Sequence, residues 1–438
     1  MKKKNPNTSS LTRLVLLFPL IFLQSIAYSK SVNIKDFGAI GNGTHDDTRA
    51  FVRAINTGNI IYIPKGVYKI IGQVKFSGIS NKTIIAQNAI IKNFSDTKGL
   101  LAFINGQNIS INGGTWGRNK MPVEESKNAE DHVFTFVNIK NLKVQSVTIK
   151  GSGQMGISMI AVTNAAIKNN HISDCFRDGI YAHYSAKLIY SGNHLENIKD
   201  DAMSIHDYGI NEQKTVLQNQ GYAQAGHATI TGNTVKNAYQ GFSSIGCADV
   251  VISYNKITNT VNSGIAVFNS EKLFPGGTAR VNKVSILYNQ LSYNGGKQTI
   301  LKKTFINNGQ LTSGRSAIFV GVNDKDDLIN NPDTRLRNIK IENNIIHSSY
   351  VNGCYVAQVD GLSLINNSFT NCDIDRSNYS GRIVEVSNCT QTTIRRNKII
   401  DNRKTVLHDA GYDIINVKGN ISGWTVRGHI DKVEGYIR

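Results

Sequence analysis

The sequence predicts an all-β protein, a single-stranded right-handed parallel β-helix of about 10–12 coils. Three observations favour this fold. A unit of an apolar run, an asparagine and a second apolar run recurs every 22 or 23 residues, as from Asn170 to Asn193 and from Asn233 to Asn255. Apolar residues alternate with others inside each run, which is strand periodicity. The 438 residues include only 6 prolines and no low-complexity linker, which favours one long repeat domain.

Residues 1–29 have the pattern of a secretory signal peptide. Lys2–Lys4 form a charged start, and Leu14–Ile26 form an apolar run that is short for a bilayer span. An uncleaved membrane anchor is the alternative. We therefore expect a secreted or periplasmic protein, without membrane contact after cleavage, in which residues 30–438 form the β-helix domain.

A short capping helix is predicted at about residues 47–56, because Asp46 and Asp47 can cap its first turn. Its apolar face consists of Phe51, Ala54 and Ile55. The helix would cover the open end of the β-helix, where strand edges and apolar rungs otherwise meet water. The two aspartates are therefore interpreted as structural.

The repeat asparagines are expected to stack in one column, since the amide of one can bond to the asparagine of the next coil. Asparagine also tolerates the left-handed backbone that a one-residue bend needs. The column would contain Asn170, Asn193, Asn233, Asn255, Asn289, Asn344, Asn367 and Asn397. Longer intervals predict insertions that form the walls of a groove, within or around 207–227, 271–280, 295–315 and 323–337.

The 5 cysteines are odd in number and form no C-x-x-C pair. They are Cys175, Cys247, Cys354, Cys372 and Cys389. Several hold equivalent positions in the repeat, which predicts small buried residues rather than disulfides or a metal site.

Two consecutive stretches, Arg177–His183 and Asp200–His206, place an aspartate and a histidine at the same positions 23 residues apart. If one coil takes 23 residues, their side chains stack on neighbouring strands about 4.8 Å apart. Two carboxylates that close cannot both ionise freely, so one keeps its proton near neutral pH. A protonated acid beside an ionised one suits glycosidic cleavage. The candidate catalytic residues are Asp178, Asp200 and Asp201.

Other polar side chains of these stretches could bind substrate. His183, His206 and Tyr181 face outward if Ile180, Ala182, Met203 and Ile205 point inward. The histidines could bind hydroxyls, tune the acids or act as a base. Arg177 could clamp an anionic sugar, and His132 opens a similar rung and could extend the groove. The alternative is structural, with aspartates that cap turns and a histidine stack without a task.

The net charge of the chain indicates which class of molecule it binds. The net charge is +18, from 49 basic and 31 acidic residues, and removal of a leader with four basic residues leaves +14. Such a surplus favours acidic polysaccharide, nucleic acid or anionic lipid, or it is merely a basic surface. Export argues against nucleic acid, so an acidic polysaccharide is expected.

The segments Val32–Phe51 and Ile61–Tyr68 resemble the opening of the pectate-lyase-like β-helix superfamily. This resemblance implies the fold, but not one activity, because lyases, glycosidases, epimerases and phage tailspikes share it.

A narrower resemblance, to the polygalacturonase family (family 28 glycoside hydrolases), rests on Asp178-Gly179 and on Asp200-Asp201 one coil later. It implies that one acid donates a proton and the others activate water. Where that family has Gly-His-Gly, this chain has Gln240, which becomes a candidate substrate-binding residue. Ser263–Phe268 lacks the family's Arg-x-Lys.

Three functions stay open. The first is a glycoside hydrolase without metal or cofactor. The second is a polysaccharide lyase or C5-epimerase on uronates, in which the acids hold Ca²⁺ and His183, His206 or Tyr181 is the base. The third is a non-catalytic glycan-binding protein in exopolysaccharide or capsule export. A monomer or a homotrimer is expected.

Overall fold

The computed structural model describes residues 29–209, 224–270, 277–296, 306–307, 310–311, 315–321, 335–374, 382–403, 411–428 and 436–437. Nearly all of the expected leader and parts of each expected insertion lie outside these residues. Within the described residues, no helix combines the length and the apolarity that a bilayer span requires.

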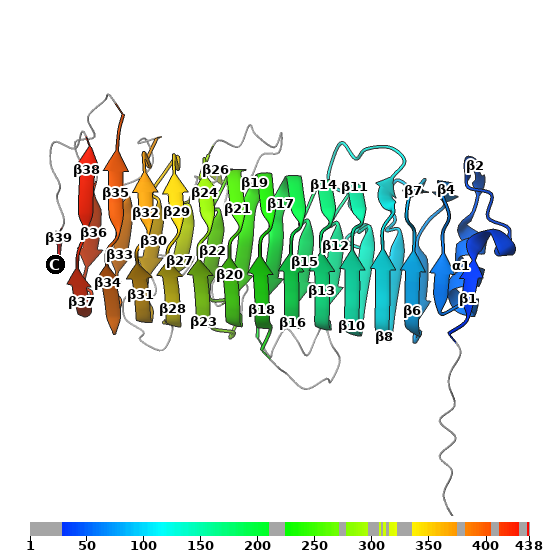
Figure 1. Cartoon of the computed structure of the whole chain (residues 1–438), viewed down its shortest axis with the longest axis horizontal. Coiled ribbons are helices and arrows are strands. Elements are labelled where there is room, and N and C mark those ends of the chain that lie inside the picture. Colours follow the sequence, from blue (N-terminus) through cyan, green and yellow to red (C-terminus); the bar gives the residue numbers. More distant parts are fainter. Residues whose placement is uncertain are drawn as a thin grey trace, which may run out of the picture.

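The described strands form a right-handed parallel β-helix, which confirms the predicted fold. Its coils follow one another along a single axis from the N-terminal to the C-terminal end (Figure 1). Of the strands described, 37 belong to one sheet, and the pairs between successive coils are parallel. A separate antiparallel pair joins β25 (Ile306–Asn307) to β26 (Gln310–Leu311).

The strands group into three faces, which we name A, B and C. Face A contains β5 (Val74–Ser77), the first parts of β8 (Leu101–Asn112) and β10 (Phe134–Gln145), β12 (Ile157–Ile160), β15 (Ile180–His183), the last parts of β17 (His194–His206) and β19 (Thr234–Ile245), β22 (Ile265–Phe268), β27 (Ile318–Gly321), β30 (Cys354–Ala357), β33 (Val384–Ser387), β36 (Tyr412–Ile415) and β39 (Tyr436–Ile437).

Face B follows face A in each coil. It contains β1 (Ser31–Asn33), β3 (Ile60–Tyr62), β6 (Ser80–Ile85), the last parts of β8 and β10, β13 (Thr163–Lys168), β16 (Ala186–Ser191), β18 (Gly226–Thr231), β20 (Ala248–Ser253), β23 (Asn282–Leu287), β28 (Leu336–Glu342), β31 (Val359–Ile365), β34 (Thr392–Arg395) and β37 (Gly419–Ser422).

Face C completes each coil. It contains β2 (Asn42–Asp46), β4 (Gly66–Ile70), β7 (Ala89–Asn93), β9 (Thr115–Arg118), β11 (Thr148–Ser152), β14 (His171–Cys175), the first parts of β17 and β19, β21 (Lys256–Thr260), β24 (Gln290–Ser292), β29 (Ile345–His347), β32 (Ser368–Thr370), β35 (Lys398–Asp401) and β38 (Thr425–Gly428).

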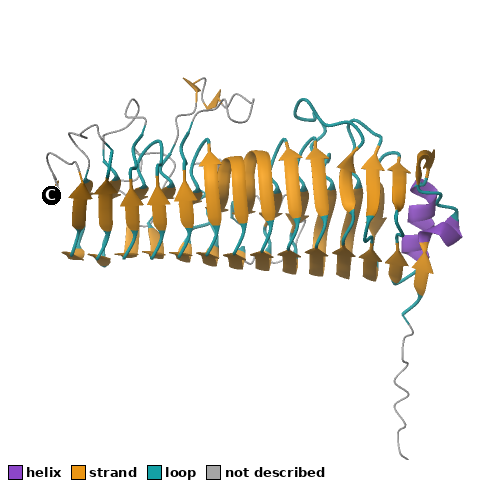
Figure 2. Cartoon of the chain, turned by 45° about the horizontal axis from the view of Figure 1, so that its top comes forward, coloured by secondary structure: helices purple, strands orange, loops and turns teal. Residues whose placement is uncertain are grey.

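The helix α1 (Thr48–Thr57) lies at the N-terminal end of the β-helix, after the 3₁₀ helix η1 (Ile34–Phe37) (Figure 2). Its buried side chains are Ala50, Phe51, Ala54 and Ile55. Asp46, not Asp47, caps it with its side chain, since Asp46 Oδ1 accepts the Thr48 amide at 3.0 Å. Asp47 instead accepts the amides of the loop at Ile40 and Gly41, which corrects its predicted role but keeps it structural.

Inward and outward side chains alternate as predicted on face A. Ile180, Ala182, Met203 and Ile205 are fully buried in the main core. All 5 cysteines are buried and free, which confirms their interpretation as small core residues. Burial raises the pKa of each of their thiols, so none is a reactive thiolate.

The eight repeat asparagines stack in one buried column between faces B and C, as predicted. Asn170 Nδ2, for example, donates to Asn193 Oδ1 at 2.9 Å, and the pattern continues to Asn397. The prediction that the column asparagines themselves have a left-handed backbone was wrong by one position. The residues with positive φ precede the column: Asn169, Gly192, Gly232, Tyr254, Tyr288, Asn343, Asn366 and Arg396.

Candidate active site

The structure brings Asp178, Asp200 and Asp201 together where two adjacent strands of face A begin. β15 pairs in register with the end of β17, so Asp178 and Asp201 hold equivalent positions on neighbouring coils. The Gly179 amide donates to the Asp201 carbonyl at 3.0 Å and fixes this register at the site. A Cβ at Gly179 would lie 2.6 Å from the Ala202 carbonyl oxygen, so the position requires glycine.

Asp178 is the most enclosed of the three acids, with 2% of its surface exposed. Ser204 Oγ donates a hydrogen bond of 2.5 Å to its Oδ2. Burial raises the pKa of Asp178 well above its ordinary value, and the charges of Asp200 and Asp201 raise it further. Arg177 and the Ser204 hydroxyl offset only part of this rise. The surroundings therefore favour the protonated form of Asp178.

The carboxyl group of Asp201 accepts hydrogen bonds from two side chains of the next coil. Gln240 Nε2 donates to Oδ1 at 3.0 Å, and Ser243 Oγ donates to Oδ2. His206 Nε2 lies 3.6 Å from the same Oδ2. The two equivalent aspartates thus have different hydrogen-bond partners.

Asp200 forms an ion pair with Arg177, whose Nε lies 2.9 Å from Asp200 Oδ2. Glu125 adds a second carboxylate 3.7 Å from Arg177 Nη1. The Asp200 charge is the main cause of the raised pKa of Arg177. In this structure the predicted sugar clamp therefore binds carboxylates of its own chain, and Asp200 has a different role from the other two acids.

His206 contacts the site through two partners. Its Nε2 lies 2.9 Å from Ser243 Oγ and its Nδ1 lies 2.9 Å from Tyr208 Oη. Burial lowers the pKa of His206, although Asp201 acts against this shift. A neutral imidazole between a serine and a tyrosine orients the hydroxyl that in turn bonds Asp201.

Aromatic rings pack against the two histidines of these coils. The His183 ring stacks on Tyr184 at 4.0 Å between centroids, and Tyr208 meets it edge-on at 4.7 Å. Tyr181 meets His206 edge-on at 5.2 Å. Tyr184 and Tyr208 belong to a second hydrophobic cluster outside the main core. His183, Tyr184 and Tyr208 are buried, so these contacts hold the histidine rings in place.

His132 has a structural role. Only 9% of it is exposed, and its Nδ1 accepts the Met155 amide at 3.2 Å. Burial, with a smaller effect from Arg177, lowers its pKa to about 4, so the ring is neutral and suited to accept this bond. These contacts do not extend the groove in the way predicted.

A family model described as "Right handed beta helix region" matches residues 66–221 and 136–276. The match agrees with the right-handed parallel β-helix seen in the strand pairing.

This β-helix protein is 25% identical to Polygalacturonase-2 of Solanum lycopersicum over 285 residues, which is 59% of each chain. It is 22% identical to the plasmin and fibronectin-binding protein A of Streptococcus pneumoniae over 274 residues, 54% of this chain and 37% of that protein. The chain therefore spans less than two thirds of the length of these relatives.

Among solved structures, the S. pneumoniae surface protein and adhesin PfbA matches with a TM-score of 0.57 and 14% identity, covering 93% of this chain and 99% of that chain. The Agl-KA catalytic domain matches with a TM-score of 0.56 and 17% identity, covering 92% and 68%. At these identities the likeness shows the shared β-helix fold alone.

The sequence did not predict the roles of three side chains at this site. The hydroxyls of Ser204 and Ser243 donate to the acids, and Tyr208 is a partner of His206. The two serines lie one coil apart in register with Tyr181. Alignment of the coils on the aspartates could have found them.

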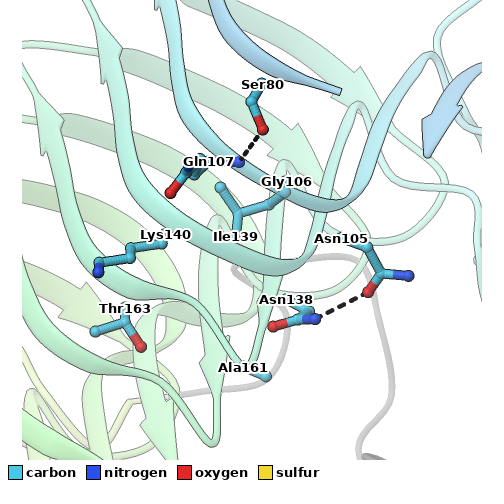
Figure 3. Close-up of a pocket in the computed structure, with 9 residues that line it drawn as sticks. All are labelled: Ser80, Asn105, Gly106, Gln107, Asn138, Ile139, Lys140, Ala161 and Thr163. Carbon is cyan, nitrogen blue, oxygen red and sulfur yellow. Dashed lines mark hydrogen bonds between the residues drawn. The ribbon is translucent and has the colours of Figure 1, made fainter. Parts of the chain in front are cut away.

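A concavity of roughly 600 Å³ lies at the bend between faces A and B, in coils N-terminal to the acids (Figure 3). It is lined by Ser80, Asn105, Gly106, Gln107, Asn138, Ile139, Lys140, Ala161 and Thr163. The Ala161 amide donates to the His183 carbonyl at 2.9 Å, so the concavity reaches the coil next to the candidate site. Amides and one ammonium group suit it to hydroxyl and carboxylate groups.

Proposed function

We propose that this protein hydrolyses glycosidic bonds of an acidic polysaccharide, with Asp178 as proton donor and Asp201 as the base that activates water. The observation that carries this proposal is the contrast between the two equivalent carboxyl groups. Burial and two neighbouring carboxylates raise the pKa of Asp178, while Gln240 and Ser243 donate hydrogen bonds to the carboxyl group of Asp201. Such a pair is what glycosidic cleavage requires.

In this mechanism Asp178 gives its proton to the glycosidic oxygen while the bond to the sugar carbon breaks. Asp201 takes a proton from the water whose oxygen forms the new bond to that carbon. Gln240 and Ser243 hold the base in place, and His206 and Tyr208 position Ser243. The Arg177–Asp200 pair keeps a fixed charge beside the acid. The reaction needs no cofactor.

Charge and shape support an acidic polymer as substrate. The formal net charge is +18, which favours polyanionic partners. The concavity that contains Lys140 can accept sugar units and their carboxylate groups. The polygalacturonase relative agrees with this substrate class. We also propose export to the periplasm or the exterior, on the strength of the leader.

A non-catalytic glycan-binding role is the second candidate. The low exposure of the acids favours it, since 2% of Asp178 and 7% of Asp201 are accessible. One relative is named as a binding protein for plasmin and fibronectin.

A Ca²⁺-dependent lyase fits the site less well. Asp178, Asp200 and Asp201 each bond to a different donor, Ser204, Arg177 and Gln240. Among the described residues, the three do not form a group whose ligand atoms all lie close together. A cation held by oxygen atoms needs several carboxylate or carbonyl oxygens around one point.

Reducing-end release from a panel of acidic and neutral glycans tests the proposal. The wild type is compared with the double variant Asp178→Asn/Asp201→Asn and with Asp174→Asn. Asp174 lies on the coil of Asp178, but its carboxylate accepts Asn197 Nδ2 in a surface column of amides. Turnover lost only in the double variant supports hydrolysis. Glycan binding without turnover, equal in all three proteins, supports the second candidate, and a product absorbing in the near ultraviolet supports a lyase.

Asp178→Asn is also expected to stabilise the protein at neutral pH. Since the pKa of Asp178 is raised in the folded state, its contribution to stability is complete below the unfolded pKa and is lost as pH rises through the folded pKa. Asparagine keeps an acceptor for Ser204 and cannot ionise. We expect thermal midpoints that agree near pH 4 and differ by a few degrees at pH 7, in favour of the variant. Scans of Asp174→Asn, which should match the wild type, provide the control; no gain at pH 7 would show that Asp178 is ionised.

A further inference from the structure

A cluster of two histidines and a glutamate lies on face C, apart from the groove. We propose that His171, His194 and Glu196 bind a divalent transition-metal ion such as Zn²⁺ or Ni²⁺. Among the described residues this is the one group of three or more metal-ligating side chains whose ligand atoms all lie within 4.8 Å of one another.

The three donors already converge. His171 Nε2 lies 3.5 Å from Glu196 Oε1, and His194 Nε2 lies 3.9 Å from Glu196 Oε2. The two imidazole rings are 4.9 Å apart between centroids. Two ligands on one tetrahedral Zn²⁺, each about 2.0–2.1 Å from the ion, are separated by about 3.4 Å. Small rotations of the side chains therefore place all three donors on one ion.

The backbone beneath the cluster is rigid. His171 of β14 pairs directly with His194 of β17. Asn170 and Asn193, which precede the two histidines, are linked in the buried column by a bond of 2.9 Å. Ile172 and Leu195, which follow them, are fully buried. A site on paired strands with locked register holds its ligands more accurately than a site on loops.

The donor set selects the class of ion. Imidazole nitrogen with one carboxylate suits Zn²⁺, Ni²⁺ and Cu²⁺, whereas Ca²⁺ and Mg²⁺ prefer oxygen ligands throughout. Side-chain exposure is 48% for His171, 43% for His194 and 35% for Glu196, so the ion can enter from solvent and keep water as its remaining ligand. The cluster is limited to two coils, because threonines pair with the histidines on either side.

The ion would join the two coils that carry the candidate acids. β14 leads directly into Asp178, and β17 continues from Glu196 to Asp201. An ion that binds the folded state and not the unfolded chain stabilises the folded state. The predicted consequence is a higher thermal midpoint with metal, independent of any catalytic activity.

Isothermal titration of the tag-free protein with ZnCl₂ and NiCl₂ tests the proposal, with CaCl₂ and MgCl₂ as comparison ions. We expect one Zn²⁺ per chain, and at least tenfold weaker binding by His194→Gln and by Glu196→Gln. His227→Gln is the matched control, since His227 is an exposed histidine paired with Asp249 at 3.2 Å. Asp201→Asn is the control for the groove. Both controls should bind as the wild type does.

Thermal unfolding with and without metal distinguishes loss of the metal site from misfolding of a variant. Without metal, His194→Gln and Glu196→Gln should unfold at the wild-type temperature, and added Zn²⁺ should raise the midpoint of the wild type and the controls alone. Co²⁺ bound by the wild type should give a visible absorption band that both site variants lack. Equal Zn²⁺ affinity in the wild type and the site variants, or affinity lost only in Asp201→Asn, overturns the proposal.

Discussion

Asp201→Asn is expected to lower the turnover of glycan hydrolysis by about 10³-fold or more, with little change in KM. Asparagine has nearly the size of aspartate and still accepts one hydrogen bond from Ser243 or Gln240, so the groove keeps its shape. It cannot take a proton from water. Because the base acts in the transition state and not in the bound complex, the loss should fall on kcat, measured by reducing-end release on the best substrate of the panel.

The two acids can be separated by the leaving group of the substrate. Aryl glycosides with an acidic phenol need little protonation, so Asp178→Asn should recover much of its activity on them, whereas Asp201→Asn should not. Asp174→Asn removes a carboxylate from the same coil as Asp178 and should keep wild-type kinetics on both substrates. Near-normal kcat for Asp201→Asn would remove the base from the mechanism.

Much of the fold could be predicted from the repeat, because residues that are one repeat apart in the sequence of a solenoid lie side by side on neighbouring coils. The interval between Asn170 and Asn193 is a step of one coil, and the structure bonds their amides directly. The same logic brought Asp178 beside Asp201 and placed Gln240 next to Asp201. These predictions needed only the count of residues in a coil.

Other features depend on side-chain directions that spacing does not encode. Tyr208 lies two residues after the end of β17, and its hydroxyl contacts the ring of His206. His132 has an outward position, yet its ring accepts a backbone amide from the next coil. Asp47 has the sequence position of a helix cap, but both of its carboxylate oxygens accept backbone amides of a loop instead.

The site therefore depends on regular stacking of the coils, which makes the asparagine column its main support. Asn233 Oδ1 accepts the amide and the side chain of Asn193, both at 2.9 Å, and its Nδ2 donates to the Tyr190 carbonyl and to Asn255 Oδ1. Asn170 and Asn193 of this column belong to the coils that carry Asp178 and Asp201, and Asn233 belongs to the next coil. Removal of this side chain leaves buried donors and a carbonyl without partners, each at a cost of about 1–3 kcal/mol.

Asn233→Ala is therefore expected to lower the free energy of unfolding by about 4 kcal/mol, measured from the guanidinium dependence of circular dichroism and tryptophan fluorescence. Backbone strain adds nothing, since Asn233 is not among the residues with positive φ. Asn141→Gly is the matched control, because Asn141 belongs to an exposed amide column and has a φ of 60° that glycine adopts freely. That change should cost less than about 1 kcal/mol, since water replaces the lost partners. Equal losses in the two variants would mean that strand pairing alone, without the buried amides, holds the coils and the two acids in register.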